Sequence, residues 1–498
     1  MNSATILATL KSLGYESVPA SWYRHIADWD AWYRGSVPDF HSYTVFNGMR
    51  HVRCRKLTAG MAKNIAESWA DLLMNAGLSV TLEGGPEQEF FDAVCAANNF
   101  RTMMNLYEEY TFALGTSAVV LRLTGVPVDG EGRLLEPGGE PGAVRPSPAI
   151  AIDFVRADGI YPLSWENGVI RECAFATAHY DGGREYLYLQ VHRRDREEQT
   201  CLVENYLYRV PEGAAEAGGA ACLERAGLNA IPVTRGIAPV FRTHSPEPLF
   251  FINTPNIANN LAPDVPMGIS VFANAVDQLM DCDNIFDSLN SEFVLGRKRI
   301  MVKPEAVRSL DGEPLFDAND LVFYILPEDG QNRSTVQEIT ATLRVDQHVA
   351  GLQLALDLLG LKCGFGPNHW KFDAGHITTA TQIITANSEE YRTQQKHQLV
   401  LESLLLRFAR TVLRLGRDFL GLPLDPEVPI SVDFDRSTVE NDGEEFERDI
   451  SMLEHGIISK EEFRMKWINE DEQTANDALA DVRKENAATG EEPPIQAG

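Results

Sequence analysis

The sequence predicts an α+β fold in which helix predominates, and three patterns support that prediction. Residues 270–295 and 342–360 each repeat apolar side chains at three- and four-residue spacings, as an amphipathic helix does. Residues from about 378 to 420 keep the same period over a longer stretch with few helix breakers. Residues 118–210 instead hold short runs rich in β-branched and aromatic residues, separated by turn signals.

The N-terminal part is expected to be helical and then to change to strands. Residues 1–45 carry an aromatic cluster, residues 50–76 an apolar stripe that includes Ile65 and Trp69, and residues 87–115 a further helical pattern. The aromatic cluster comprises Trp22, Tyr23, Trp29, Trp32 and Tyr33. The expected strands are Ala118–Leu123, Ala149–Val155, Val169–Ala178, Tyr186–His192 and Thr200–Val210. The stretches 125–148 and 212–219 are rich in turn-forming residues and are expected to be loops.

The two amphipathic helices of residues 270–295 and 342–360 enclose a short basic insert. It begins with Arg297, Lys298 and Arg299 and continues through β-rich 300–302 and 321–326. A glycine-punctuated loop follows the second helix, and the long helix comes next. In residues 444–476 the helical period returns, with Ser459 as the expected N-cap, and the tail from residue 487 has no apolar period.

Composition excludes several classes of protein. A length of 498 residues allows two to four domains, and 44 − 72 gives a net charge of −28, which excludes an ordinary sequence-reading DNA-binding protein. The 7 cysteines have no paired spacing and are expected to be reduced, buried thiols. Neither a secretory signal nor a membrane span is expected.

Several motifs, in their order along the chain, resemble those of one protein family. They are Trp29-Asp-Ala-Trp-Tyr33, His41 and Tyr43, Arg55-Lys-Leu57, Met61 to Leu73, Asn98-Asn-Phe100, Phe112 to Ala118, Ile152 to Ala157, Gly268 to Ala275 and Thr379 to Ile384. This order is similar to that of the portal proteins of tailed double-stranded DNA bacteriophages, of the siphophage type. The resemblance covers most of the chain and implies a portal fold with wing, stem, clip and crown, assembled as a ring of twelve subunits.

The resemblance also divides the chain. It implies a wing at 1–267, the first stem helix at 268–295, a clip at 296–340 and the second stem helix at 341–360. A tunnel loop would follow at 361–377, a long wing helix and strand at 378–436, a crown at 437–486 and a disordered tail at 487–498.

The expected site residues follow from this division. The tunnel loop would place Lys362, Phe365, His369, Trp370 and Lys371 against DNA. The stem would line the channel with Asp283, Asp287 and Asp346, whose charge repels the phosphates. The clip would present Arg297, Lys298, Arg299 and Lys303, which either pair with a neighbouring subunit's carboxylates or contact DNA or the packaging ATPase.

The resemblance implies a conduit for DNA packaging and ejection, located in the virion and, during assembly, in the host cytoplasm. Its expected partners are further copies of itself, the terminase large subunit, the major capsid and scaffold proteins, a head-completion or tail adaptor, and double-stranded DNA held without sequence specificity. No membrane partner, catalytic residue, metal or cofactor is expected.

Two alternative classes remain open at this point. A metal-dependent nucleic-acid enzyme would use Asp281, Asp283 and Asp287, although their spacing does not match a calcium loop, since Ile285 stands at a ligand position. Asp433 and Asp435 resemble a transferase metal motif but also fit an alternating strand. The second alternative is a monomeric helical adaptor or scaffold protein of the virion.

Overall fold

Helices account for 46% and strands for 25% of the computed structural model, which confirms the α+β class; the expected predominance of helix is not confirmed. The chain separates into two units, Met1–Asp433 and Phe434–Gly498. The structure describes residues 3–46, 48–74, 78–125, 129, 149–195, 197–211, 223–296, 299–302, 323–325, 336–339, 342–366, 369–370, 380–434, 449–453, 455 and 458–467.

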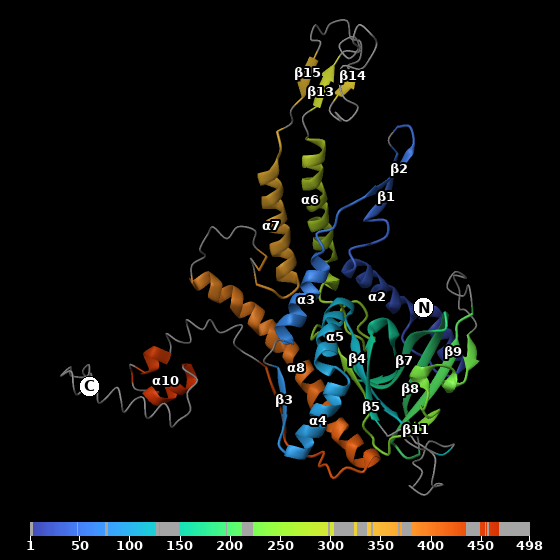
Figure 1. Cartoon of the computed structure of the whole chain (residues 1–498). Helices are drawn as coiled ribbons and strands as arrows, with labels where there is room; N and C mark the ends of the chain where they lie inside the picture. The colour runs from blue at the N-terminus through green and yellow to red at the C-terminus, as the bar shows by residue number, and fades with distance from the viewer. Residues whose placement is uncertain are drawn as a thin grey trace, which may run out of the picture. The chain divides into compact units, whose positions relative to one another are not determined.

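Eight long helices are described in the first unit (Figure 1). They are α1 (Ser3–Ser12), α2 (Ala20–Tyr33), α3 (Met61–Leu73), α4 (Gly85–Ala97), α5 (Phe100–Leu114), α6 (Val276–Leu295), α7 (Val345–Lys362) and α8 (Ala380–Leu420). Short 3-10 turns occur at η1 (Ala157–Gly159), η2 (Leu228–Ala230), η3 (Pro232–Thr234) and η4 (Ala273–Ala275).

The described strands form five sheets. The largest is an antiparallel meander, β6 (Ile160–Glu166), β7 (Val169–Asp181), β8 (Arg184–Arg194), β9 (Cys201–Arg209) and β10 (Glu224–Ala226), with β11 (Val240–Arg242) also paired to β9. A second sheet has the order β12 (Phe250–Asn253), β4 (Ser117–Thr124), β5 (Ala149–Arg156). Two pairs are β1 (Ser42–Phe46) with β2 (His51–Arg55), and β16 (Ile430–Asp433) with β3 (Ser79–Leu82). The fifth sheet has β13 (Arg299–Val302) between β14 (Phe323–Ile325) and β15 (Val336–Ile339).

The five expected strands between residues 118 and 210 are confirmed within three residues at each end. Two helix predictions were wrong in part. Residues 42–46 and 51–55 pair as an antiparallel hairpin, and the helix expected over 50–76 begins only at Met61. Residues 87–115 form two helices, because Asn99 has a left-handed backbone with φ 50 that ends one helix and begins the next. The predicted loops at 125–148 and 212–219 lie almost wholly outside the described residues.

The core of the first unit forms where α3, α5 and α8 meet the sheet of β12, β4 and β5. Trp69, Phe112 and Phe408 are fully buried there, and the Phe408 ring stacks on Phe100 with centroids 4.6 Å apart. Each such side chain contributes roughly 2–3 kcal/mol by leaving water. The 41 residues of α8, which span roughly 60 Å, run along this core and hold its helices together.

Helices α6 and α7 lie side by side, with the sheet of β13, β14 and β15 beyond their far ends (Figure 1). We call α6 and α7 the helix pair. Leu279, Leu352 and Leu356 are buried near the body of the unit. At the other end the Arg344 guanidinium binds the Glu292 carboxylate. The pair is therefore held by apolar packing at its base and by an ion pair at its tip.

The base of the helix pair joins the body through two glycines in backbone contact. Gly115 ends α5 with φ 82, and a Cβ there would lie 2.4 Å from the carbonyl oxygen of Gly268. A Cβ on Gly268 would lie 2.3 Å from the oxygen of Gly115. Val271 N–H also donates to the Phe112 carbonyl at 2.9 Å. Only glycine permits this approach, so it fixes where the chain enters the helix pair.

Gly268→Ala is expected to destabilise the protein by about 2 kcal/mol or more, because the methyl group has no space between the two backbones. Gly227→Ala is the matched control, since nothing lies within 4 Å of the added Cβ. Thermal unfolding compares the two variants. An unchanged midpoint for Gly268→Ala would contradict the close contact.

A buried polar cluster lies beside this junction. The Glu108 carboxyl is 2% exposed and accepts a hydrogen bond from Asn253, while the Thr111 and Ser117 hydroxyls are 2.6 Å apart. Burial raises the pKa of Glu108 to about 7, and the Asn253 hydrogen bond offsets only part of that rise. Glu108 therefore stays protonated in the folded protein at pH values where it ionises in the unfolded chain.

The sign of the pH dependence follows. Between the ordinary carboxyl pKa of 4.5 and about 7, the folded state binds more protons than the unfolded state, so stability falls as pH rises through this window. Glu108→Gln is expected to remove that fall, and its advantage over the natural protein should grow to about 3 kcal/mol at neutral pH. Urea unfolding at pH 5 and pH 7.5 measures the difference, with exposed Glu89→Gln as the control. A constant difference between the two pH values would contradict it.

The second unit contains α10 (Lys460–Trp467). Its N-terminus is a capping box: the Glu462 N–H donates to Ser459 Oγ at 3.0 Å, and the Ser459 N–H donates to Glu462 Oε2 at 2.8 Å. The prediction that Ser459 is an N-cap is confirmed.

Candidate functional site

The base of the helix pair is fixed by a buried carboxylate. Asp283, on α6, is 3% exposed, and its Oδ2 lies 2.9 Å from Nε2 of buried His41. The Val37 N–H donates to Nδ1 of the same ring at 2.9 Å, so Nε2 carries the proton and donates to Asp283. The other carboxylate oxygen accepts from the Ala59 N–H at 2.6 Å and the Thr58 hydroxyl at 3.1 Å.

The next turn of α6 continues this attachment. Asp287 Oδ1 accepts from the Leu57 N–H at 2.9 Å, and Asn284 Oδ1 accepts from Lys56 Nζ at 2.6 Å. The Lys56 ammonium also lies 3.7 Å from the centroid of the Phe40 ring. Side chains on one face of α6 therefore bind both ends of the segment that contains β1 and β2.

These contacts correct the expectation for the acidic residues. The expectation that Asp283 lines the channel is wrong, because its carboxylate is buried inside the subunit and both oxygens accept internal hydrogen bonds. Asp287 is partly buried, and its Oδ1 accepts a hydrogen bond from the Leu57 N–H. Asp346, near the start of α7, is exposed as expected. Its place in a channel stays a prediction.

The segment after α7 is bound to the body. Phe365 is 1% exposed and stacks on Trp69 with centroids 4.6 Å apart, and the Trp69 indole N–H donates to the Cys363 carbonyl at 3.0 Å. The expectation that Phe365 contacts DNA is therefore wrong, because the side chain fills the core. It anchors the segment instead.

Three other expected tunnel-loop residues lie nearer the surface. Lys362 is exposed and donates to the Asn274 carbonyl at 3.2 Å. His369 Nδ1 lies 3.1 Å from a Glu390 carboxylate oxygen on α8, and the Trp370 carbonyl accepts from the Gln353 amide at 2.8 Å. Their contact with DNA stays a prediction.

The remaining expected residues fall mostly outside the described residues. This holds for Lys371, Arg297, Lys298 and Lys303, and for Asp435. Arg299 begins β13, the central strand of the sheet at the tip of the helix pair. Asp433 ends β16, as the alternating-strand interpretation predicts.

Helix α7 has two apolar faces, one buried and one exposed. Leu352, Leu356 and Leu359 are buried against the body and α6. On the opposite side, Leu354, Leu358 and Leu361 are 62%, 48% and 55% exposed. These three leucines lie four and three residues apart and form one ridge, which we call the leucine ridge. A helix that is apolar on both sides is normally covered on both sides, so the ridge is a candidate protein interface.

An apolar groove of about 660 Å³ lies on the other side of the helix pair. Its walls come from the start of α3, from α6, from α7 and from the segment after α7. They are Thr58, Ala59, Met61, Asn64, Phe286, Leu289, Val349, Leu352, Leu356, His369 and Trp370. The groove adjoins the segment that α6 binds through Asp283 and Asp287.

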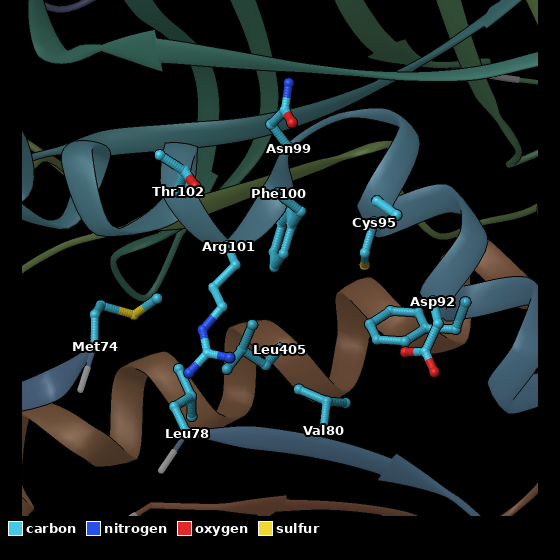
Figure 2. Close-up of a pocket in the computed structure, with 12 residues that line it drawn as sticks. Met74, Leu78, Val80, Asp92, Cys95, Asn99, Phe100, Arg101, Thr102 and Leu405 are labelled. Carbon is cyan, nitrogen blue, oxygen red and sulfur yellow. The ribbon is translucent and has the colours of Figure 1, made fainter. Parts of the chain in front are cut away.

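A second cavity, of about 330 Å³, lies among α4, the start of α5, β3 and α8 (Figure 2). Phe100, Leu405 and Val80 line it, the Arg101 side chain extends across it, and Asp92 stands at its edge. Its cysteine, Cys95, has its pKa raised to about 12 by burial, so the thiol is protonated and weakly nucleophilic.

Buried titratable groups elsewhere serve packing. Burial lowers the pKa of His397 to about 3, and its neutral ring accepts a hydrogen bond from the Asn256 N–H at 3.0 Å. The pKa of the Cys363 and Cys282 thiols is raised to about 12 by burial. The six cysteines that the structure describes are free thiols.

Within the described ranges, no group of three or more His, Cys, Asp or Glu side chains could hold a metal ion. In the cluster of Asp281, Asp283 and Asp287, both oxygens of the Asp283 carboxylate accept hydrogen bonds from His41, Thr58 and Ala59. No described helix combines the length and apolar composition that crossing a bilayer requires.

Sequence reasoning missed the hairpin of β1 and β2, the His41–Asp283 bond and the groove. The hairpin had a local signal, since tyrosine, valine and cysteine alternate with polar residues around Gly48, which has φ 90. The His41–Asp283 bond had none, because it joins residues 242 positions apart.

A scan against protein-family models and a search of curated proteins found no match for this chain.

Asp283→Ala is expected to destabilise the protein by about 3 kcal/mol or more, because it leaves the buried His41 ring N–H and the Ala59 N–H without an acceptor. Asp281→Ala is the control, since Asp281 is exposed on the same helix and its removal should cost about 0.5 kcal/mol or less. Thermal unfolding, followed by circular dichroism, measures both. Equal midpoints for the two variants would contradict the anchoring role.

Proposed function

We propose that this chain is a subunit of a phage portal, a ring at one capsid vertex through which DNA enters during packaging and leaves during ejection. The leucine ridge is the observation that carries the proposal. A subunit with a long helix pair, an uncovered apolar ridge on one side of it and an apolar groove on the other is suited to repeated assembly. The motif order along the chain supports the same conclusion.

The charge of the chain agrees with a conduit rather than a DNA clamp. A net charge of −28 disfavours tight binding of phosphates, and a wall through which DNA slides needs weak contact. Lys362 is an exposed base at the end of α7. In the proposed ring, it contacts DNA.

The proposed partners follow from the same assignment. The sheet of β13, β14 and β15 at the tip of the helix pair would serve as the clip, where terminase and later a head-completion or tail adaptor bind. The major capsid and scaffold proteins would surround the ring at its vertex. A cofactor and a catalytic step have no part in this proposal.

The purified protein is expected to form closed rings that native mass spectrometry and negative-stain images detect. Leu354→Glu with Leu358→Glu should abolish the rings, because two carboxylates would enter an apolar interface and weaken each contact at least about 100-fold. Leu106→Glu with Leu261→Glu is the matched control, as both leucines are exposed and lie outside the helix pair.

A natural protein that stays monomeric at micromolar concentration, alone and with capsid components, would contradict the proposal and favour a monomeric adaptor. Rings that survive the double ridge substitution would show that another surface assembles them. Unchanged circular dichroism of both double variants confirms that folding is intact.

A further inference from the structure

The hairpin of β1 and β2 has two chemically different faces. Its register pairs Tyr43 with Cys54 and Val45 with Val52, so these four residues share one face, which is apolar. Thr44, Phe46, His51, Arg53 and Arg55 share the other face. We call this hairpin, with its turn, the arm. Val45 is 45% exposed and Phe46 58% exposed, so the arm carries apolar surface outside the core.

The arm is basic in an acidic chain. Residues 42–56 contain Arg50, Arg53, Arg55 and Lys56 and no Asp or Glu. The exposed arginines Arg53 and Arg55 lie on the same strand and the same face. In a chain of net charge −28, such a segment is attracted to the acidic surface of another copy.

The base of the arm is fixed while its strands pack mainly on each other. Carboxylates of α6 bind the chain on both sides of the arm. They accept hydrogen bonds from His41, just before β1, and from the N–H groups of Leu57 and Ala59, just after β2. Among the described elements, the extensive contacts of β1 and β2 are only those between the two strands. An isolated two-stranded hairpin is marginally stable in water, so this arm needs a further surface to pack on.

A matching surface lies on the other flank of the helix pair. In Figure 1 the arm and α7 lie on opposite sides of α6. The outer face of α7 carries exposed Asp346 and Ala350 near its start and the leucine ridge near its end. It therefore offers negative charge and apolar surface together, which complement the face of the arm that holds Phe46, Arg53 and Arg55.

We propose that the arm of one copy packs on the outer face of α7 of the next copy. Phe46 then covers part of the leucine ridge, and Arg53 and Arg55, which share its face of the arm, lie near Asp346. Because the two surfaces are different and lie on opposite flanks, the contact is head to tail, as a ring requires. This inference rests on the proposed ring function and identifies the arm of a neighbouring copy as the surface that packs on the leucine ridge.

Mixing two variants tests the contact. The arm variant, Arg53→Glu with Arg55→Glu, keeps its α7 face, whereas the ridge variant, Leu354→Glu with Leu358→Glu, keeps its arm. Each alone is expected to be monomeric. An equimolar mixture is expected to give a species of two subunits and nothing larger, because only one intact contact can form. Native mass spectrometry of two isotope-labelled variants identifies the pair.

The matched control for the arm variant is Arg171→Glu with Arg184→Glu, which reverses two exposed arginines on β7 and β8 and should leave rings intact. A second measurement does not depend on disruptive changes. With Cys54→Ser, the pair Thr44→Cys and Ala350→Cys should give a ladder of covalent oligomers with a short bismaleimide, and either cysteine alone should not.

Several results would overturn the inference while leaving the ring function intact. Rings or dimers formed by the arm variant alone would show that the ridge has another partner, such as a second ridge. Rings of the arm variant that package DNA but fail to retain it would assign the arginines to DNA. If the double-cysteine variant forms rings of the natural size but the bismaleimide gives no covalent oligomers, the arm does not contact the outer face of α7. A monomeric natural protein would instead contradict the ring function itself.

Discussion

The buried carboxylate of Asp283 sets the geometry on which the rest of the helix pair depends. A carboxylate that leaves water needs donors for both oxygens, and here they come from His41, Thr58 and Ala59. These donors lie on both sides of the arm in sequence. One charged group thus fixes the rotation of α6, the base of the arm and the wall of the groove together.

This arrangement explains why the acidic residues of α6 differ in role despite their similar spacing. Asp281 is exposed, Asp283 is enclosed and Asp287 binds the Leu57 N–H. Periodicity places residues on a face, but it does not say what covers that face. The same limit applies to Phe365, whose glycine neighbours suggested a loop exposed in a channel. The Trp69 ring, distant in sequence, places it in the core.

The sequence was sufficient for features whose cause is local. The helix pair, α8 and the strands β7, β8 and β9 of the large sheet follow from apolar periods of three to four or of two residues. Ser459 was predictable because its partner, Glu462, is three residues away. The arm and the ridge were not, since each depends on which surface the rest of the chain leaves uncovered. Exposure of Leu354 is a property of the packed structure, although the apolar period of α7 is visible in the sequence.

The contact between Gly115 and Gly268 has a mechanical consequence. Two backbones that meet without side chains between them cannot slide past each other without breaking the hydrogen bond from Val271 to Phe112. The junction between the body and the helix pair is therefore expected to be rigid and not to act as a hinge. A displacement of the far tip would therefore be passed on to α5 and the body of the unit, rather than absorbed at this junction.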